Sequence, residues 1–589
     1  MDKLTSAQLD RACGALLGSA VGDALGAGYE FGSARLGPDG PSMIGGGLGN
    51  FAPGEWTDDT TMAWCIADVA ASGADLRTDE ALTQIARRFR DWYDTGPSDI
   101  GIQTSRVLRE VGAEPTSATM LATSYDLHQR TGHTAGNGSL MRTAAVALPH
   151  LDDPDAVADA ARKVSALTHY DPRAGEACVL WSLAIRHAVL FGELDVRAGL
   201  DLLDDEAAAY WSKRIDEAET RQPGHFNPNG WVVAAFQAAW SAIVHTPVPT
   251  GASECRQFGD ALATAIAIGD DTDTVAAIAG ALLGARWGAS AVPAEWRRVV
   301  HGYPGLRGER LVELAYLAAN KGPGIYDWPV ASRIDYSSYG INRTFVQHPY
   351  DDGVWLGDAG VLDDLPKEVT AVVSLCLVGS EQVRPGVEHV VFRLIDKAGR
   401  SENINLPFVL ADAARTIATL RDEGHVVLLH CVAAQSRTPT VGIAYAMLRG
   451  VPVAEATERV CGALPAAAPN QGFQALLNAR DAFGFGGTAG PAGGADGASG
   501  LVFADITEVL KYFESSGLDD LGGCIADRAD IDFDVYMFED DGIVLGMSHP
   551  HGMQAFVLEF PMTEETFWEY VNDLEDQVLE MWEAASDDS

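Results

Sequence analysis

Gly269-Asp270-Asp271-Thr272-Asp273-Thr274 runs directly into Val-Ala-Ala-Ile-Ala-Gly-Ala-Leu-Leu-Gly-Ala-Arg-Trp-Gly288, so a cluster of carboxylates and hydroxyls stands at the start of an alanine-rich segment. Alanine and small apolar residues favour a helix over residues 275–288. The segment therefore predicts a buried helix whose first turn carries several acidic side chains.

A second cluster of the same kind lies about 210 residues earlier, at Thr57-Asp58-Asp59-Thr60-Thr61, and precedes another helical segment over residues 62–71. Neighbouring carboxylates repel one another and are costly to bury, so a buried cluster needs a cation or shared protons. Oxygen ligands of this kind suit Mg²⁺ or Mn²⁺ better than zinc. One cluster alone fits a solvated helix start capped by Thr or Asp, but two favour a binuclear metal site.

The first 330 residues read as a helical domain. Apolar residues recur there at three- and four-residue spacing, with Gly- and Pro-rich connections between the segments and little strand-like alternation. The segments with this spacing are residues 7–20, 61–71, 78–92, 174–191, 231–245 and 258–268. The pattern predicts an all-α orthogonal bundle over residues 1–330.

The pattern changes after Ile334. Short β-branched segments at residues 369–375, 389–394 and 425–430 alternate with helical stretches at 407–423 and 438–449. This alternation is typical of an α/β domain with a mostly parallel sheet, which we place at residues 338–483.

Residues 484–500 are rich in Gly and Ala and predict a linker. The segment 501–589 that follows holds 23 acidic residues against only Lys511 and Arg528, half of the chain's net charge of −42. Strand-like alternation over residues 533–547 and a helical pattern over 562–585 predict a small acidic α+β module whose role the sequence does not indicate.

The net charge of −42 argues against nucleic-acid binding, which requires a basic face. An arginine-bearing substrate would be attracted by such a charge. The N-terminus shows no secretory signal pattern, no uninterrupted apolar run approaches membrane-spanning length, and eight scattered cysteines fit a reducing compartment. We therefore expect a cytoplasmic protein that does not bind membranes.

Residues 1–320 resemble the ADP-ribosylglycohydrolase family, of the type that activates dinitrogenase reductase. Six blocks carry the resemblance in order: Gly14-Ala-Leu-Leu-Gly-Ser-Ala-Val-Gly-Asp23-Ala-Leu-Gly with Glu30; Trp56 to Thr60; Gly96-Pro-Ser-Asp99-Ile-Gly101; Gly136-Asn-Gly-Ser-Leu-Met-Arg142; Thr168-His169; and Gly269 to Thr274. The resemblance implies two divalent ions, Mg²⁺ or Mn²⁺, that bind a ribose and activate water. The ligands it implies are Thr57, Asp58, Asp59, Asp271, Asp273 and Thr274.

The same resemblance implies roles for two further acids. Glu30 would orient substrate or polarise water beside the metals, whereas in isolation it would read as a surface glutamate. Asp99 would lie near the substrate guanidinium, with capping of the turn after Pro97 as the alternative. Asp23 reads as a structural support for a helix or loop.

Substrate contacts are implied by two other blocks. Asn137, Gly138 and Ser139 would offer backbone N–H groups to a diphosphate at a helix start. His169 would contact ADP-ribose, although a lone histidine is more often a core residue.

His430-Cys431-Val-Ala-Ala434-Gln-Ser-Arg437-Thr438 fits Cys-x5-Arg between a strand and a helix. Five intervening residues can wrap their N–H groups around a phosphoryl group, the helix start favours the thiolate, and the arginine binds two oxygens. The motif predicts a cysteine-dependent phosphatase site.

Residues 338–483 thus resemble the dual-specificity phosphatases. The resemblance implies that Asp396, 35 residues before Cys431, is the general acid and that Thr438 assists departure of the thiol. The family has glycine where this chain has Ala434, which distorts the loop if that position needs a positive φ. An active phosphatase, a phosphate-binding relic and a chance match are the alternatives.

The prediction is therefore a metal-dependent hydrolase that removes ADP-ribose from modified protein side chains, arginine above all, with a second, cysteine-dependent phosphatase activity on an unknown phosphorylated substrate. The alternative is an ADP-ribose-binding reader, or a scaffold whose phosphatase-like domain is inactive.

Overall fold

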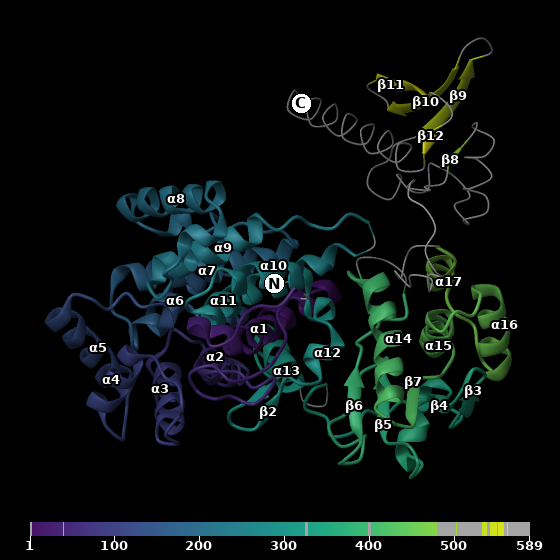
Figure 1. The fold of residues 1–589 in the computed structure, drawn as a ribbon, viewed down its shortest axis with the longest axis horizontal. Helices are drawn as coiled ribbons and strands as arrows, with labels where there is room; N and C mark the ends of the chain where they lie inside the picture. Colours follow the sequence, from purple (N-terminus) through teal and green to yellow (C-terminus); the bar gives the residue numbers. More distant parts are fainter. Residues whose placement is uncertain are drawn as a thin grey trace. The chain divides into compact units, whose positions relative to one another are not determined.

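The computed structural model describes residues 3–479, apart from 39, 252, 324–327 and 398–401, and five short strands between 502 and 563. The chain divides into two compact units, Met1–Phe485 and Gly486–Ser589 (Figure 1). The linker predicted at 484–500 lies outside the described residues, as does the helix predicted at 562–585 apart from Met562 and Thr563. The prediction is wrong for these two residues, which form a strand that pairs with Val502 and Phe503.

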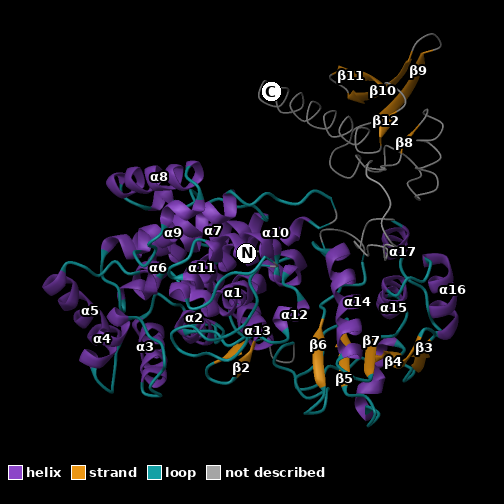
Figure 2. Ribbon diagram, viewed as in Figure 1, coloured by secondary structure: helices purple, strands orange, loops and turns teal. Residues whose placement is uncertain are grey.

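The first part of unit 1 is helical, as predicted (Figure 2). Its helices are α1 (Ser6–Gly26), α2 (Asp58–Ala70), α3 (Asp79–Tyr93), α4 (Ile102–Val111), α5 (Ser117–Thr131), α6 (Pro154–Ala166), α7 (Pro172–Phe191), α8 (Asp205–Thr220), α9 (Val232–Val244), α10 (Gln257–Ala267), α11 (Thr272–Trp287), α12 (Ala294–Arg297) and α13 (Gly308–Ala319). The all-α prediction missed one antiparallel pair, β1 (His301–Gly302) with β2 (Leu306–Arg307). These two-residue strands are too short to show alternation.

Helices α1 and α11 lie at backbone contact in the centre of this part. A Cβ added to Gly14 would lie 2.1 Å from the Gly284 carbonyl oxygen, and one added to Gly18 would lie 2.3 Å from that of Gly280. Only glycine permits helices to pack this closely. The packing brings the end of α1 to the start of α11, where the Thr272 hydroxyl donates to the Gly26 carbonyl at 2.8 Å. Two segments about 250 residues apart in sequence thereby meet at the predicted metal site.

The second part of unit 1 is the predicted α/β half. Its five-stranded sheet has the order β3-β4-β7-β5-β6, antiparallel only between the first two strands. The strands are β3 (Phe345–His348), β4 (Asp351–Asp358), β5 (Ala371–Ser374), β6 (Glu388–Val391) and β7 (Val427–Cys431), and the helices are α14 (Leu406–Asp422), α15 (Arg437–Leu448), α16 (Val453–Ala463) and α17 (Gln471–Asn478). Ala371 and Leu429 face the helices, whereas Val372 and Leu428 face the opposite layer.

Each half has its own apolar core. The larger core runs from Ala12 to Trp328 and takes in Phe408 of α14, while the smaller is built from the sheet and its helices and takes in Ala294 of α12. Phe408 of the α/β half therefore packs in the core of the helical half, and Ala294 of the helical half packs in the core of the α/β half.

Two remaining features concern α7 and the second unit. Helix α7 is long and apolar enough to span a membrane, but two thirds of it is buried inside the protein. In the second unit, β9 (Phe533–Phe538), β10 (Gly542–His549) and β11 (Gly552–Leu558) form an antiparallel sheet, and β8 (Val502–Phe503) pairs with β12 (Met562–Thr563). The strands β9 and β10 fall in the segment where strands are predicted.

Candidate active sites

The first site forms where the end of α1 meets the starts of α2 and α11. Asp23, fully buried, accepts from the backbone N–H groups of Thr57 and Thr60 at 3.0 Å and from the Thr60 hydroxyl at 2.6 Å. It thereby ties α1 to the first turn of α2. The Thr57 hydroxyl also caps α2 by accepting from the Asp59 N–H at 3.3 Å, so this threonine has a capping role in addition to any ligand role.

The predicted ligands Asp59, Asp271 and Asp273 lie in two carboxylate triads that overlap at Asp273. Asp23, Asp59 and Asp273 each offer an oxygen within 4.8 Å of the others, and so do Glu30, Asp271 and Asp273. The Thr274 hydroxyl donates to Asp59 Oδ1 at 3.2 Å, which links the two helix starts.

Burial and mutual repulsion raise the pKa of nearly every acid here. Burial and the charge of Asp99 raise the pKa of Asp58 to about 7, and the same causes raise that of Glu30 to about 8. Burial raises the pKa of Asp59 well above its usual value, with the charge of Asp273 as the next cause. Burial likewise raises the pKa of Asp273, with the charge of Asp271 as the next cause. A cation would relieve all of these costs at once.

The donor set fits a divalent cation. Asp59 Oδ2 and Glu30 Oε2 are buried and have no hydrogen-bond partner among the described residues. A buried carboxylate oxygen without a donor is costly, and one such oxygen in each of two triads that share Asp273 is the observation that favours a bound ion. All the oxygens are carboxylate or hydroxyl, as Mg²⁺ and Mn²⁺ prefer.

Asp58 and Asp99 border this cluster. The Gly101 N–H donates to Asp58 Oδ2 at 3.2 Å, which brings the Gly96–Gly101 block to the start of α2. Burial and the charge of Asp271 raise the pKa of Asp99, so Asp99 faces the acids rather than only capping its turn.

The segment predicted to bind a diphosphate, residues 136–139, does not lead into an α-helix as expected. It enters a three-residue 3-10 turn, Asn137–Ser139, and not an α-helix. The Asn137 N–H donates to the Gly230 carbonyl at 3.2 Å, and its side chain donates to Asp271 Oδ2 at 2.7 Å. Asn137 therefore holds the acidic loop, and a diphosphate would have to bind to the rest of the block. An isolated β-bridge between Gly136 and Trp231 holds the start of this block against the loop that contains Gly230.

His169 lies against this block. A Cβ added to Gly138 would lie 3.2 Å from His169 Nε2, and His169 Nδ1 lies 2.8 Å from the Thr168 hydroxyl. Burial lowers the pKa of His169 to about 3, so the ring is neutral at ordinary pH and can exchange hydrogen bonds with a neutral or anionic ligand.

The second site lies at the carboxyl end of β7. Cys431 ends the strand, and Arg437 begins α15. Arg437 Nη1 donates to the carbonyls of Leu375 at 3.0 Å and Leu394 at 2.9 Å, while its buried Nε has no hydrogen-bond partner in the described chain. The guanidinium is thus fixed with a donor still available for a phosphate oxygen.

Asp396 sits beside the same loop although it is 35 residues earlier. Its Oδ1 accepts from the Ser436 hydroxyl at 2.6 Å and from Asn470 Nδ2 at 2.9 Å, and its Oδ2 lies 3.8 Å from Arg437 Nε. These contacts hold the carboxyl at the rim of the Cys431 loop, within reach of a substrate bound there.

Two loop residues depart from an ideal phosphatase site. Ala434 has φ 54°, the left-handed conformation that glycine adopts freely. The strain costs about 1–2 kcal/mol. The Thr438 hydroxyl donates to the Gly357 carbonyl at 3.2 Å, so its proposed role at the thiol requires that this bond be exchanged.

Comparison with known proteins decides the family of the helical half. A sequence profile described as ADP-ribosylglycohydrolase matches residues 4–324, more than half of the chain. The chain belongs to the ADP-ribosylglycohydrolase family. It is 33% identical over 302 residues to ADP-ribosylarginine hydrolase Tri1 of Pseudomonas putida, a match that covers 49% of this chain and 73% of that protein.

A second relative supports the same assignment. The ADP-ribosyl-(dinitrogen reductase) glycohydrolase of Rhodospirillum rubrum is 29% identical over 292 residues, covering 49% of this chain and 89% of its own. Part of the chain is similar to the solved structure of human DUSP28, with 25% identity, coverage of 23% of this chain and 92% of that one, and a TM-score of 0.20. A TM-score of this size carries no conclusion about activity.

One structural residue of this ADP-ribosylglycohydrolase was missed from the sequence. Asn229 is fully buried and accepts from the Asp271 N–H at 3.0 Å, while its Nδ2 donates to the Gly269 carbonyl at 3.0 Å. Its own N–H donates to Asp270 Oδ2 at 3.0 Å. The Asn-Pro-Asn-Gly turn at 227–230 marks a loop, but nothing in it indicates a partner about 40 residues away.

Proposed function

We propose that this protein removes ADP-ribose from arginine side chains of modified proteins in a metal-dependent hydrolysis. The observation that carries the proposal is the convergence of Glu30, Asp59, Asp271 and Asp273 on one buried cluster with two unpartnered oxygens. This cluster lies within the segment that matches the family, and a relative with 33% identity acts on ADP-ribosylarginine by its name.

Thr57, Asp58, Asp59, Asp271, Asp273 and Thr274 would hold two divalent ions, Mg²⁺ or Mn²⁺. When bound, the ions would orient the ribose hydroxyls and supply an activated water.

The protein's own groups hold this arrangement and the substrate. Asp23 fixes the start of α2, and Asn137 and Asn229 fix the loop that carries Asp271. Glu30, whose Oε2 has no hydrogen-bond partner among the described residues, would accept a proton from the attacking water or from a substrate hydroxyl. Neutral His169 would contact the ADP-ribose. In this proposal Asp99 attracts the substrate guanidinium. Water adds to the anomeric carbon of the ribose as the carbon–nitrogen bond breaks, the guanidine leaves as a neutral group, and it then takes up the proton that the water gives up.

The test is hydrolysis of mono-ADP-ribosylated arginine and serine peptides by the full chain in Mg²⁺, in Mn²⁺ and in chelator. We expect release of ADP-ribose from arginine, dependent on the ion, and loss of it in Asp58→Ala and Asp273→Ala. Asp159→Asn, at an exposed helix position paired with Lys163, is the matched control. Binding of ADP-ribose without turnover would instead identify a reader.

A second activity is proposed for the α/β half, a cysteine-dependent phosphatase. The fixed Arg437 guanidinium beside Cys431 and Asp396 favours it. The Cys431 thiolate would attack phosphorus, the P–O bond would break, and Asp396 would give its proton to the leaving oxygen. Water would then cleave the P–S bond, return a proton to Asp396 and release inorganic phosphate.

Hydrolysis of p-nitrophenyl phosphate tests this second activity. We expect Cys431→Ser to abolish it, and Cys461→Ser to serve as the control because Cys461 lies partly exposed on α16. No turnover in the native protein would leave the α/β half as a phosphate-binding domain or a scaffold.

A further inference from the structure

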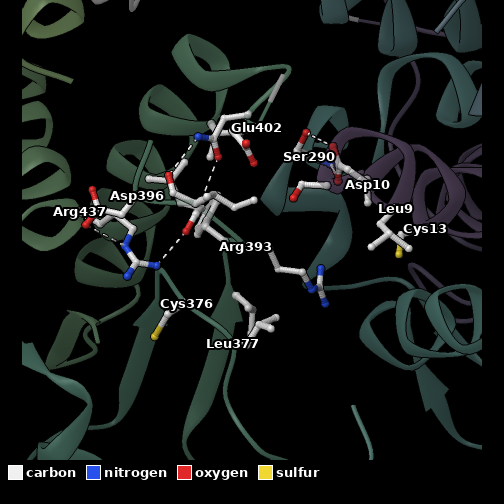
Figure 3. Close-up of a pocket in the computed structure, with 18 of the residues that line it drawn as sticks. Leu9, Asp10, Cys13, Ser290, Cys376, Leu377, Arg393, Asp396, Glu402 and Arg437 are labelled. Carbon is white, nitrogen blue, oxygen red and sulfur yellow. Dashed lines mark hydrogen bonds and ion pairs between the residues drawn. The ribbon is translucent and has the colours of Figure 1, made fainter. Parts of the chain in front are cut away.

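A pocket of about 430 Å³ lies between the helical half and the α/β half of unit 1 (Figure 3). Its walls need both halves, so no segment matched by the glycohydrolase family could form it alone. The helical half contributes Asp10, Tyr316 and Trp328, and the α/β half contributes Arg393, Asp396 and Arg437. Two members of the phosphatase-like site, Asp396 and Arg437, therefore line a pocket that the other half closes.

Ion pairs and a hydrogen bond from two arginines hold the two halves together. Arg298 of the helical half pairs with Glu423 at 2.7 Å and with Glu388 at 3.2 Å. Arg297 donates to the Val391 carbonyl at 2.8 Å. Because these bonds anchor β6 and the end of α14 to the helical half, the pocket wall is a fixed part of the unit.

The pocket carries unused positive donors. Arg437 Nε is buried without a hydrogen-bond partner among the described residues, and so is Arg393 Nε. Arg393 pairs with Glu309 and lies over the Trp328 ring, 4.8 Å from its centroid. Each guanidinium has a carboxylate beside it, Glu309 for Arg393 and Asp396 for Arg437, but the two buried Nε–H donors make no hydrogen bond in the described chain and could donate to an anionic ligand.

The rest of the lining is aromatic and apolar. Trp328 packs edge-on against Tyr316 with ring centroids 4.9 Å apart, and Tyr336 is held by its hydroxyl, which donates to the Leu377 carbonyl at 2.7 Å. Such surfaces bind flat rings. The volume lies within the range of small-molecule sites, about 300–1,000 Å³.

The end away from Arg437 carries an acceptor. Figure 3 shows Asp10 with Ser290 on one side of the pocket and Arg437 with Asp396 on the other, with Arg393 between them. Asp10 accepts from the Ser290 hydroxyl at 2.5 Å and from its N–H at 3.1 Å. A ring with an N–H or amino group on its edge could share this carboxyl.

We propose that the phosphatase-like site hydrolyses small phosphate monoesters that bear an aromatic or heterocyclic ring, such as nucleoside monophosphates, and not phosphoproteins. The phosphate binds at Arg437 and the ring lies in the pocket against Trp328. This rests on the proposed cysteine phosphatase. Because residues of the helical half line the same pocket as Arg437 and Asp396, a small ester fits this site better than a phosphorylated side chain on a folded protein.

The test compares three substrates with the full chain: adenosine 5′-monophosphate, p-nitrophenyl phosphate and a phosphotyrosine peptide. Trp328→Ala should raise KM for adenosine monophosphate about tenfold, the size of one lost aromatic contact, with kcat little changed. Trp328→Phe should restore most of the affinity. Tyr125→Ala removes an exposed ring outside the pocket and should change nothing.

The outcomes separate the two proposals. Cys431-dependent turnover that favours the peptide, unchanged by Trp328→Ala, would overturn the substrate class and leave the phosphatase standing. If no substrate is turned over, the phosphatase fails, and calorimetry with adenosine monophosphate then decides the pocket. Binding to Cys431→Ser that is lost in the double variant with Trp328→Ala supports the pocket, and absence of binding refutes it.

Discussion

The two candidate sites of unit 1 differ in the charge of the groups that they bury. The helical half buries acids together, and two carboxylate oxygens there accept no hydrogen bond from the described residues. The α/β half instead buries guanidinium groups whose Nε–H donors make no hydrogen bond in the same part of the chain, although each group has a carboxylate beside it. The first arrangement attracts a cation and the second an anion. Unpartnered groups thus indicate the charge of the missing ligand more directly than the fold does.

The largest expected effect is a complete separation of the two activities. Asp273→Asn should lower glycohydrolase turnover by about three orders of magnitude, because several kcal/mol of metal-dependent stabilisation are lost, while phosphate hydrolysis is unchanged. Cys431→Ser should do the reverse. Both activities are measured on the same preparations, and loss of both in either variant would show that the two sites are not independent.

Asp396→Asn sharpens the comparison within the cysteine site. Without its proton, release of an alkoxide leaving group should slow by about a hundredfold or more, whereas release of p-nitrophenolate, a weak base, should slow much less. The measurement is kcat on both kinds of ester. Equal slowing on both would mean that Asp396 positions Ser436 and Asn470 rather than acting as the general acid.

Removal of the metal should expose the cost of the acidic cluster. Burial and Asp273 raise the pKa of Asp59, so its charged form opposes folding at neutral pH and this cost is lost as pH falls through the folded pKa. In chelator at pH 7, Asp59→Asn should therefore stabilise the protein by about 1–3 kcal/mol. With saturating Mn²⁺ the sign should reverse. Destabilisation in both conditions would contradict the repulsion.

His169 gives a smaller effect that depends on pH. Burial lowers its pKa to about 3, below the unfolded value of about 6.5. The unfolded state therefore binds the proton first, and stability is lost as pH falls below about 6.5. In the His169→Asn variant, the free energy of unfolding should fall less steeply as pH falls, by up to about 1.4 kcal/mol per pH unit. Melting curves between pH 7 and 5, with exposed His225→Asn as control, measure it, and parallel curves would refute a buried neutral ring.

The sequence predicted the features that are local. The glycohydrolase blocks, the α/β alternation and the Cys431 loop all depend on residues close together in the chain. The helices and strands predicted between residues 7 and 449 are present, whereas β3 and β4 were not predicted as strands. Asp23, predicted as a support, binds the first turn of α2 through Thr57 and Thr60.

What the sequence could not show depends on distant contacts. The role of Asn229 rests on a loop about 40 residues later, and that of Asn137 on Asp271, 134 residues away. Asp10 and Arg437 line the same pocket between the halves, although no periodicity or motif connects them in the sequence. Spacing predicts which residues share an element, whereas these sites are set by which elements touch.

The smallest expected effect is that of Ala434→Gly. At φ 54° glycine would remove about 1–2 kcal/mol of strain. It would also lose about 0.8 kcal/mol of methyl burial and about 0.5–1 kcal/mol through its freer unfolded chain. These effects nearly cancel, so the melting temperature should stay within about 2 °C, while a relaxed loop should raise phosphate turnover a few-fold.

Ala433→Gly is the matched control, because its φ is not positive and no strain is relieved there. It should lose about 1 kcal/mol, or roughly 2–4 °C in melting temperature, without a gain in turnover. The informative quantity is the difference between the two glycine variants, since both share the unfolded-state cost. If Ala434→Gly is destabilised as much as Ala433→Gly, the left-handed alanine stores no strain, and the loop that holds Cys431 is already relaxed without the glycine.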